Sequence, residues 1–179
     1  MNILTDQSYY TYYPSPIGIL KIEFNNQALL SVEFDDHLRE VKNNCQQNFY
    51  EDPKLLNIYN LIFDQLNQYF MGERSDFEIP LNLDGNSFEL KVWRELKKIP
   101  YAEVYSYKEI AGKISKSSSI AKVVEASFHN PISIIIPSHR LVSSEGNLKS
   151  YSGGIWRKKW LLNHENNKSK NIERKISFV

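Results

Sequence analysis

Alternating apolar and polar positions near the start of the chain predict a β-hairpin with one buried face. Every second residue of the segment 20–24 is apolar, and the residues between them are charged. Residues 30–34 repeat the alternation, and the polar stretch 25–27 supplies turn-forming side chains. One face of this hairpin is therefore expected to pack against a core.

A helix is expected next, because apolar residues recur every three or four positions from residue 54 onward. Gly72 stands where such a helix would end. Residues 73–87 are polar and are interrupted by Pro80 and Gly85, which predicts a linker that could include a short strand.

Helical periodicity returns in the second half of the chain. Residues 87–100 carry an apolar stripe that ends at Pro100. Residues 106–114 follow, with Ser106 as the expected N-cap and Glu109 as its capping-box partner. A short polar break separates this segment from a further helical pattern at 119–129. Two short helices around a tight break are typical of a helix-turn-helix, whose second helix contacts DNA, although many such pairs bind nothing.

A candidate site lies at the end of the apolar run that follows these helices. The segment ISIIIP, residues 132–137, predicts a buried strand that ends just before Ser138, His139 and Arg140. A helix with Trp156, Trp160 and Leu161 on its apolar side is expected after the glycine pair, and residues 166–179 are expected to form a polar tail.

The composition indicates a packed protein rather than a disordered one. The chain has 179 residues, of which 41% are hydrophobic and 13% aromatic. Its single cysteine, Cys45, excludes an internal disulfide or a cysteine-rich metal site and favours a cytoplasmic location. We see no secretory signal and no apolar run long enough to span a membrane.

Charge is distributed very unevenly along the chain. The net charge is +1, but residues 1–90 carry 5 Lys and Arg against 14 Asp and Glu, whereas residues 91–179 carry 17 against 7. A basic half beside an acidic half favours contact with a polyanion over a chance segregation of solvated faces. As a group, we expect phosphate contacts from Lys91, Arg94, Lys97, Lys98, Lys108, Lys113 and Lys116, and less clearly from Arg157, Lys158 and Lys159.

Several long segments, in order, resemble the alkylguanine-DNA alkyltransferases, also called methylated-DNA–protein-cysteine methyltransferases. The resemblance runs from about Tyr12 to Glu165. It is carried by SPIGILKIEF, LNQYFMGERSDFEIPL, FELKVWRELKKIPYAEVYSYKEIA, NPISIIIPSHRLV and YSGGIWRKKWLLNHE. Members of this family take an alkyl group from the exocyclic oxygen of guanine onto a cysteine of their own.

The resemblance implies a two-domain fold and a DNA partner. An α/β domain of the ribonuclease-H-like type is expected at 1–84, and a mainly helical, winged-helix-like DNA-binding domain at 85–165. The implied partner is double-stranded DNA containing alkylated guanine, with the base flipped into a pocket. Downstream repair proteins are further candidate partners. No cofactor, metal or membrane is implied.

Matching positions carry the family's functional residues into this chain. Ser138 stands at the acceptor position, His139 and Glu165 match the histidine that activates the acceptor through a water and the glutamate that holds it, and Asn130 matches a bracing asparagine. The DNA-binding and base-binding positions are Tyr107, Ala121, Lys122, Arg140, Tyr151, Ser152 and Gly153.

Two of these positions depart from the family pattern. The motif Pro-Cys-His-Arg is Pro-Ser-His-Arg here, and Ala121 stands where an arginine fills the gap in the duplex. Ile120 could supply an apolar wedge and Lys122 a cation, but neither replaces the arginine fully. Val124 and Glu125 stand where a glycine pair is usual.

The serine changes the chemistry that is expected. Displacement at an alkyl carbon needs a strong nucleophile, and a thiol with a pKa near ~8.5 can be ionised by its surroundings. A hydroxyl is a far weaker acid, so alkylation of Ser138 is expected to be very slow or absent. Cys45 lies in the acidic half and is expected only to pack.

Three functions remain open from the sequence. The preferred one is a lesion-binding protein that does not transfer, as in the alkyltransferase-like proteins, because serine and Ala121 occur together. The second is an active methyltransferase whose cysteine was exchanged for serine. The third is a Ser-His-Glu hydrolase, for which no oxyanion hole is indicated.

Overall fold

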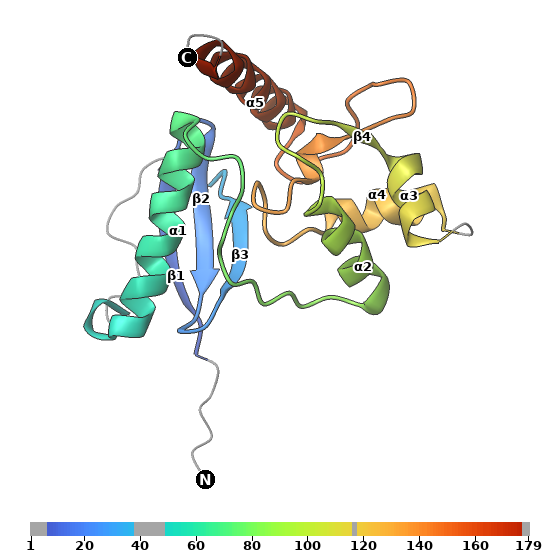
Figure 1. Ribbon diagram of the computed structural model, residues 1–179. Helices are drawn as coiled ribbons and strands as arrows, with labels where there is room; N and C mark the ends of the chain where they lie inside the picture. The colour runs from blue at the N-terminus through green and yellow to red at the C-terminus, as the bar shows by residue number, and fades with distance from the viewer. Residues whose placement is uncertain (1–6, 38–48, 116–117, 177–179) are drawn as a thin grey trace. The chain divides into compact units, whose positions relative to one another are not determined.

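The computed structural model describes residues 7–37, 49–115 and 118–176, and these form two compact units, 1–84 and 85–179 (Figure 1). Cys45 lies outside the described residues, as does Lys116. Each unit is described by itself below.

The first unit contains a three-stranded antiparallel sheet. Its strands are β1 (Tyr9–Ser15), β2 (Gly18–Phe24) and β3 (Leu29–Phe34), in the order β1-β2-β3. The predicted hairpin of β2 and β3 is confirmed, and Leu20, Ile22 and Phe24 are fully buried. The sequence reading missed β1, because its tyrosine-rich segment has no clear apolar–polar alternation. Leu29 also forms a parallel bridge to Leu81, which is the short extended piece of the linker.

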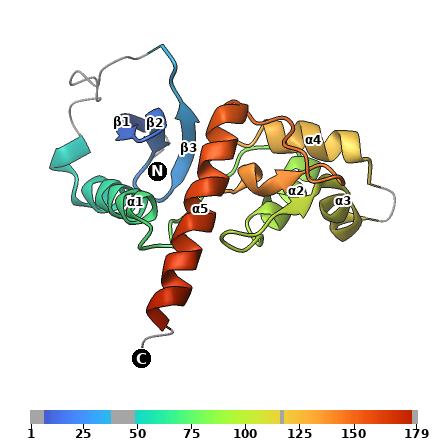
Figure 2. The ribbon, with the colours of Figure 1, turned by 90° about the horizontal axis from the view of Figure 1, so that it is seen from above.

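One long helix covers this sheet. After a short 3-10 helix, η1 (Phe49–Glu51), helix α1 (Pro53–Met71) begins at Asp52, whose side chain accepts a hydrogen bond from the Lys54 backbone N–H. The helix ends at Gly72, in the left-handed conformation with φ of 75°. Figure 2 shows α1 running beside the three strands, and its buried residues form the core with the inner face of the sheet.

The second unit is built around three short helices: α2 (Ser87–Leu96), α3 (Tyr107–Ile114) and α4 (Ile120–Phe128). The capping box predicted at Ser106 and Glu109 is present at the start of α3, and Asn86 with Glu89 makes a second one at α2. The Trp93 indole N–H donates to the backbone oxygen of Ala126 over 2.7 Å, which ties α2 to α4. A two-stranded parallel sheet, β4 (Tyr105–Ser106) with β5 (Leu141–Val142), closes the unit.

Two predicted elements differ in the structure. Residues 132–137, expected as a strand, form a buried series of turns that leads into a 3-10 helix, η2 (Ser138–Arg140). The apolar residues of this segment correctly indicated that it is buried, but an apolar run does not distinguish a buried strand from a buried turn. The last helix, α5 (Ile155–Ile176), continues through most of the segment expected as a polar tail.

Within the described residues, no helix combines the length and the apolar character that crossing a membrane requires.

The same substitution at two glycines of the second unit is predicted to have opposite effects on stability. A methyl group at Gly85 would lie 2.6 Å from the ring of Trp93, which is 2% exposed and cannot move aside. Gly85→Ala should therefore lower the free energy of unfolding by about 1–3 kcal/mol. At Gly112, inside α3, the added methyl group meets nothing within 4 Å. Gly112→Ala should raise the free energy of unfolding by about 0.5–1 kcal/mol, because alanine loses less backbone entropy than glycine on folding.

Urea unfolding of the two variants beside the unchanged protein measures both effects. A stabilised Gly85→Ala protein would contradict the tight packing of Trp93, and a destabilised Gly112→Ala protein would contradict the open helix face.

Candidate functional site

The turn that precedes Ser138 is held by the side chain of Asn130. The Asn130 amide donates to the Ile136 backbone oxygen over 2.8 Å, and its Oδ1 accepts from the Ile132 N–H over 3.1 Å. The residue between them, Ile134, has a φ of 73°, a conformation that costs a β-branched residue about 1–3 kcal/mol. The asparagine bonds therefore stabilise a strained backbone that presents Ser138 in one position.

Ser138 is the first residue of η2, and only 3% of its surface is exposed. The Asn130 amide lies 3.3 Å from the Ser138 hydroxyl oxygen. Among the described residues, no hydrogen bond joins this hydroxyl to His139. Of the three groups a Ser-His-Glu hydrolase would need, only the histidine and the glutamate are hydrogen-bonded to each other. Contact between a nucleobase and Ser138 requires the wall around the hydroxyl to open.

Glu165 of α5 is the centre of a buried cluster of polar groups. His139 Nε2 lies 2.8 Å from Glu165 Oε1. Arg140 donates from Nε to Oε2 and from Nη2 to Oε1, both over 3.0 Å. The backbone N–H of Ala102 also donates to Oε2 over 3.1 Å, from a residue with a φ of 62°. The carboxylate thus joins α5, η2 and the turn after α2.

The contacts within this cluster determine the protonation states of Glu165 and His139. Burial by itself raises the pKa of Glu165, but the hydrogen bond to His139 and the guanidinium of Arg140 outweigh it, so the pKa lies below its ordinary range. Burial lowers the pKa of His139, which is fully buried, although Glu165 partly opposes this. At neutral pH we therefore assign a neutral imidazole whose Nε2–H donates to an ionised Glu165. Its Nδ1 has no hydrogen-bond partner in the described part of the chain.

Arg140 was placed among the DNA-contacting residues by resemblance, but its guanidinium faces inward. The residue is 4% exposed, and besides Glu165 its Nη1 donates to the Ile99 backbone oxygen over 2.6 Å. The guanidinium also lies 5.7 Å from the ring centre of Tyr101, where burial raises the pKa of the phenol to about 12. Arg140 therefore positions Glu165, and none of these contacts leaves it directed at a phosphate in solvent.

The loop before α5 covers the imidazole. The ring of Tyr151 is buried and meets the ring of His139 edge to face at 6.3 Å between centroids. Ser152 is exposed, whereas Gly153 is buried and its backbone oxygen accepts from Arg157 Nη1 over 3.0 Å. Three of the predicted base-binding residues thus lie on one short segment, with only Ser152 open to solvent.

Lys158 is a member of the site that sequence reasoning assigned differently. It was grouped with solvent-facing cations, but it is fully buried, and burial lowers its pKa to about 8. Its ammonium group donates to the Lys149 oxygen over 2.8 Å and lies 3.4 Å from the Tyr107 hydroxyl. The helical period could have indicated this position, because Lys158, Leu161 and Glu165 share one face of α5.

Ala121 and Lys122 lie apart from the buried cluster. Both are exposed in the first turn of α4, next to Ile120, whose side chain is 46% exposed. Lys122 borders a cavity of about 430 Å³ between the start of α2 and α4. The cavity is lined by Asn86, Phe88, Glu89, Lys122, Glu125, Ala126 and His129. Ser138 is not among its lining residues.

No metal centre is indicated in the part of the chain that the structure describes, because no three His, Cys, Asp or Glu side chains converge there. The cluster holds one histidine and one carboxylate, and an arginine occupies the remaining side of that carboxylate.

Comparison with known families matches both units of the chain. A model described as 6-O-methylguanine DNA methyltransferase, ribonuclease-like domain, matches residues 8–83. The DNA binding domain of the same methyltransferase matches residues 87–167. The chain belongs to the 6-O-methylguanine DNA methyltransferase family. The resemblance and the two-domain fold expected from the sequence are confirmed at this level.

Relatives of this family member cover nearly its full length. A methylated-DNA–protein-cysteine methyltransferase of Mycobacterium bovis is 36% identical over 161 residues, spanning 90% of this chain and 94% of the relative. One from Haemophilus influenzae is 32% identical over 163 residues. A crystal structure of Mycobacterium tuberculosis OGT in complex with DNA superposes with a TM-score of 0.75 at 36% identity, covering 89% of this chain and 93% of that one.

Acid is predicted to destabilise this methyltransferase-family protein through His139. A histidine whose pKa is lowered on folding contributes stability above its unfolded pKa of about 6.5, and that stability is lost as the pH falls. The free energy of unfolding should therefore drop between pH 7 and pH 5, by at most about 1.4 kcal/mol per pH unit. Glu165, whose pKa is also lowered, adds a further loss below about pH 4.5.

His139→Gln tests this assignment, because glutamine keeps a donor for Glu165 but does not titrate. Urea unfolding at a series of pH values should show a flatter profile between pH 7 and pH 5 for the variant. His37→Gln, at an exposed position, is the control for the loss of a histidine. A variant at His139 with an unchanged slope would show that the buried imidazole is not the titrating group.

Proposed function

We propose that this protein binds double-stranded DNA, takes an alkylated guanine out of the base stack and holds it beside Ser138 without accepting the alkyl group. Support for the DNA partner comes from the match of residues 87–167 to a DNA binding domain and from the DNA complex of the Mycobacterium tuberculosis relative. Flipping is required because the exocyclic oxygen of guanine cannot be reached by a nucleophile inside a duplex.

The proposed lack of alkyl transfer rests on one observation: the side chain at position 138 ends in a hydroxyl group, not a thiol. The names of the relatives place the transferred group on a cysteine, and by the resemblance Ser138 stands at that acceptor position. Here the amide of Asn130 lies 3.3 Å from the Ser138 hydroxyl oxygen. Even with a base nearby, a hydroxyl yields far less anion than a thiol, and displacement at carbon needs that anion.

The rest of the site suits the recognition of a base rather than its chemistry. The buried Tyr151 ring, Gly153 and the Tyr107–Lys158 pair are held in place by hydrogen bonds and packing, and they must move apart to admit a base. A lesion held there is stabilised outside the stack, and it can be presented to other repair proteins. The cost of unstacking, a few kcal/mol, is smallest for a damaged base, which is one source of selectivity.

An active methyltransferase whose acceptor cysteine has been exchanged for serine is the second candidate. The complete His139–Glu165–Arg140 cluster favours it, because nothing around the acceptor position is lost. Ala121 counts against it, since the gap-filling arginine is missing from α4 as well. A Ser-His-Glu hydrolase receives no support, because Ser138 and His139 are not hydrogen-bonded to each other.

Binding to duplexes with O6-methylguanine or plain guanine at one position tests the proposed function. At a fixed salt concentration we expect tighter binding to the methylated duplex, and intact-mass spectrometry afterwards should show no added methyl group. Equal affinities for the two duplexes would show that the protein does not recognise the lesion, and would refute the proposal. A mass increase on the peptide that contains Ser138 would establish transfer and overturn the proposal.

Restoring the thiol separates the two candidates. In a Cys45→Ser background, which removes the other cysteine of the chain, Ser138→Cys should give at most slow transfer, because Ala121 leaves the flipped state unsupported. A further Ala121→Arg change should then raise the rate of methyl gain measured by mass spectrometry. Rapid transfer by Ser138→Cys alone would favour the second candidate.

A further inference from the structure

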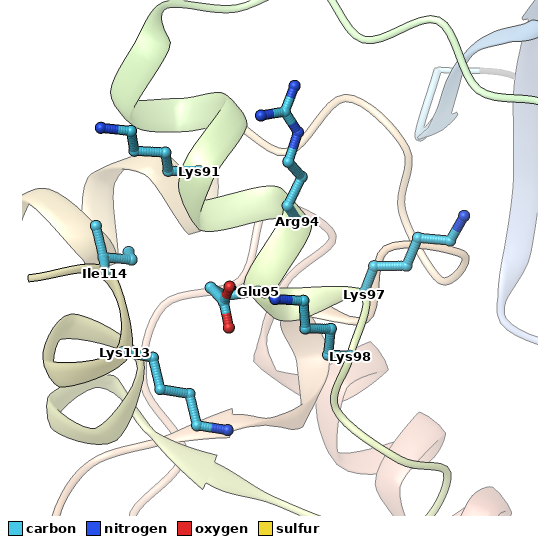
Figure 3. A pocket seen from close by; sticks show the side chains of 7 residues that line it. All are labelled: Lys91, Arg94, Glu95, Lys97, Lys98, Lys113 and Ile114. Carbon is cyan, nitrogen blue, oxygen red and sulfur yellow. Dashed lines mark hydrogen bonds and ion pairs between the residues drawn. The ribbon is translucent and has the colours of Figure 1, made fainter.

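A groove of about 460 Å³ lies between α2 and the end of α3 in the second unit. We call it the basic groove; it is lined by Lys91, Arg94, Glu95, Lys97, Lys98, Lys113 and Ile114. Figure 3 shows Glu95, Lys98 and Lys113 near one another, whereas Arg94 and Lys97 extend outward from α2. Five of the seven lining residues are cationic, and one is acidic.

Most of this positive charge has no counter-ion. Glu95 is the single acid of the groove, and its carboxylate is already paired with Lys98 over 2.5 Å. The ammonium group of Lys113 lies 4.2 Å from the ring centre of Tyr105. Lys91, Arg94 and Lys97 are exposed, and no ion pair within the described residues neutralises them. Mutual repulsion of these side chains is relieved when an anion binds between them.

The unpaired cations occupy successive turns of α2. Lys91 and Arg94 are three residues apart, and Lys97 follows after three more, at the C-cap. At 1.5 Å per residue these six steps span about 9 Å along the helix. Because a step of three residues falls short of a full turn, the three side chains point in different directions, as Figure 3 shows. They therefore form a broad positive surface, which suits a charged backbone better than a single small anion.

The basic groove is separate from the helix that is expected to contact the bases. No residue of α4 lines it, and Lys122 of α4 lines the other cavity instead. The opposite side of α2 is buried, with Val92, Trp93 and Leu96 in the core of the unit. A DNA strand held in the groove would thus contact the protein at a place of its own.

We propose that the basic groove binds the phosphate backbone of DNA as a second contact surface, outside the segment held by α4. This inference rests on the proposed function, because it takes DNA as the partner of the second unit. The contact is independent of sequence and of the lesion, since phosphates carry no base information. It raises affinity for all DNA and keeps the protein on the duplex while it meets successive bases.

Single charge changes on one turn of α2 test the groove, with unmodified duplex DNA as the probe. Arg94→Gln should weaken binding several-fold and reduce the slope of log affinity against log salt by about one. Glu95→Gln should strengthen binding, because it removes the acid and frees Lys98. Lys54→Gln, an exposed lysine of the first unit, should change neither affinity nor slope.

The outcomes distinguish the groove from the lesion site. If Arg94→Gln binds like the unchanged protein, or if Lys54→Gln weakens binding equally, the groove is not a DNA contact and the proposal is overturned. The ratio of affinities for methylated and plain duplexes should be the same in Arg94→Gln as in the unchanged protein. If the unchanged protein binds methylated and plain duplexes equally, the proposed lesion site is refuted, but the effect of Arg94→Gln on DNA affinity can still be measured.

Discussion

The buried carboxylate of Glu165 is the interaction on which the site depends. It accepts hydrogen bonds from His139, from two nitrogens of Arg140 and from the Ala102 backbone, so a charge with no access to water is satisfied on all sides. Removing one partner of such a buried pair typically costs about 3–5 kcal/mol, because the other charge is left uncompensated. Helix α5, the 3-10 helix with Ser138 and the turn after α2 are therefore held together as one piece.

This arrangement separates the framework of the site from its reactivity. Asn130 supports the strained turn at Ile134 and reaches the Ser138 hydroxyl, while Glu165 and Arg140 orient His139. None of these bonds requires a sulfur atom at position 138. The packing around position 138 is therefore compatible with a serine there, as the proposed binding without transfer requires.

Charge in the second unit serves two different purposes. The buried cations Arg140 and Lys158 stabilise the interior, where each is surrounded by acceptors. Lys91, Arg94 and Lys97 of the basic groove have no ion-pair partner among the described residues, and they raise the potential of the surface on one side of α2. A count of basic residues does not separate these classes, because burial decides whether a lysine or arginine is available to a phosphate.

The sequence by itself determined the local structure and the family. Apolar periodicity located α1 and the hairpin, the predicted capping residues Ser106 and Gly72 stand at helix ends, and long segments identified the family. These features depend on neighbours along the chain, so they can be read from it. Only the tertiary structure decided that 132–137 forms turns, that Arg140 and Lys158 face inward, and that the Asn130 amide contacts Ser138. Those outcomes depend on which distant groups meet in the core, and no local pattern encodes that.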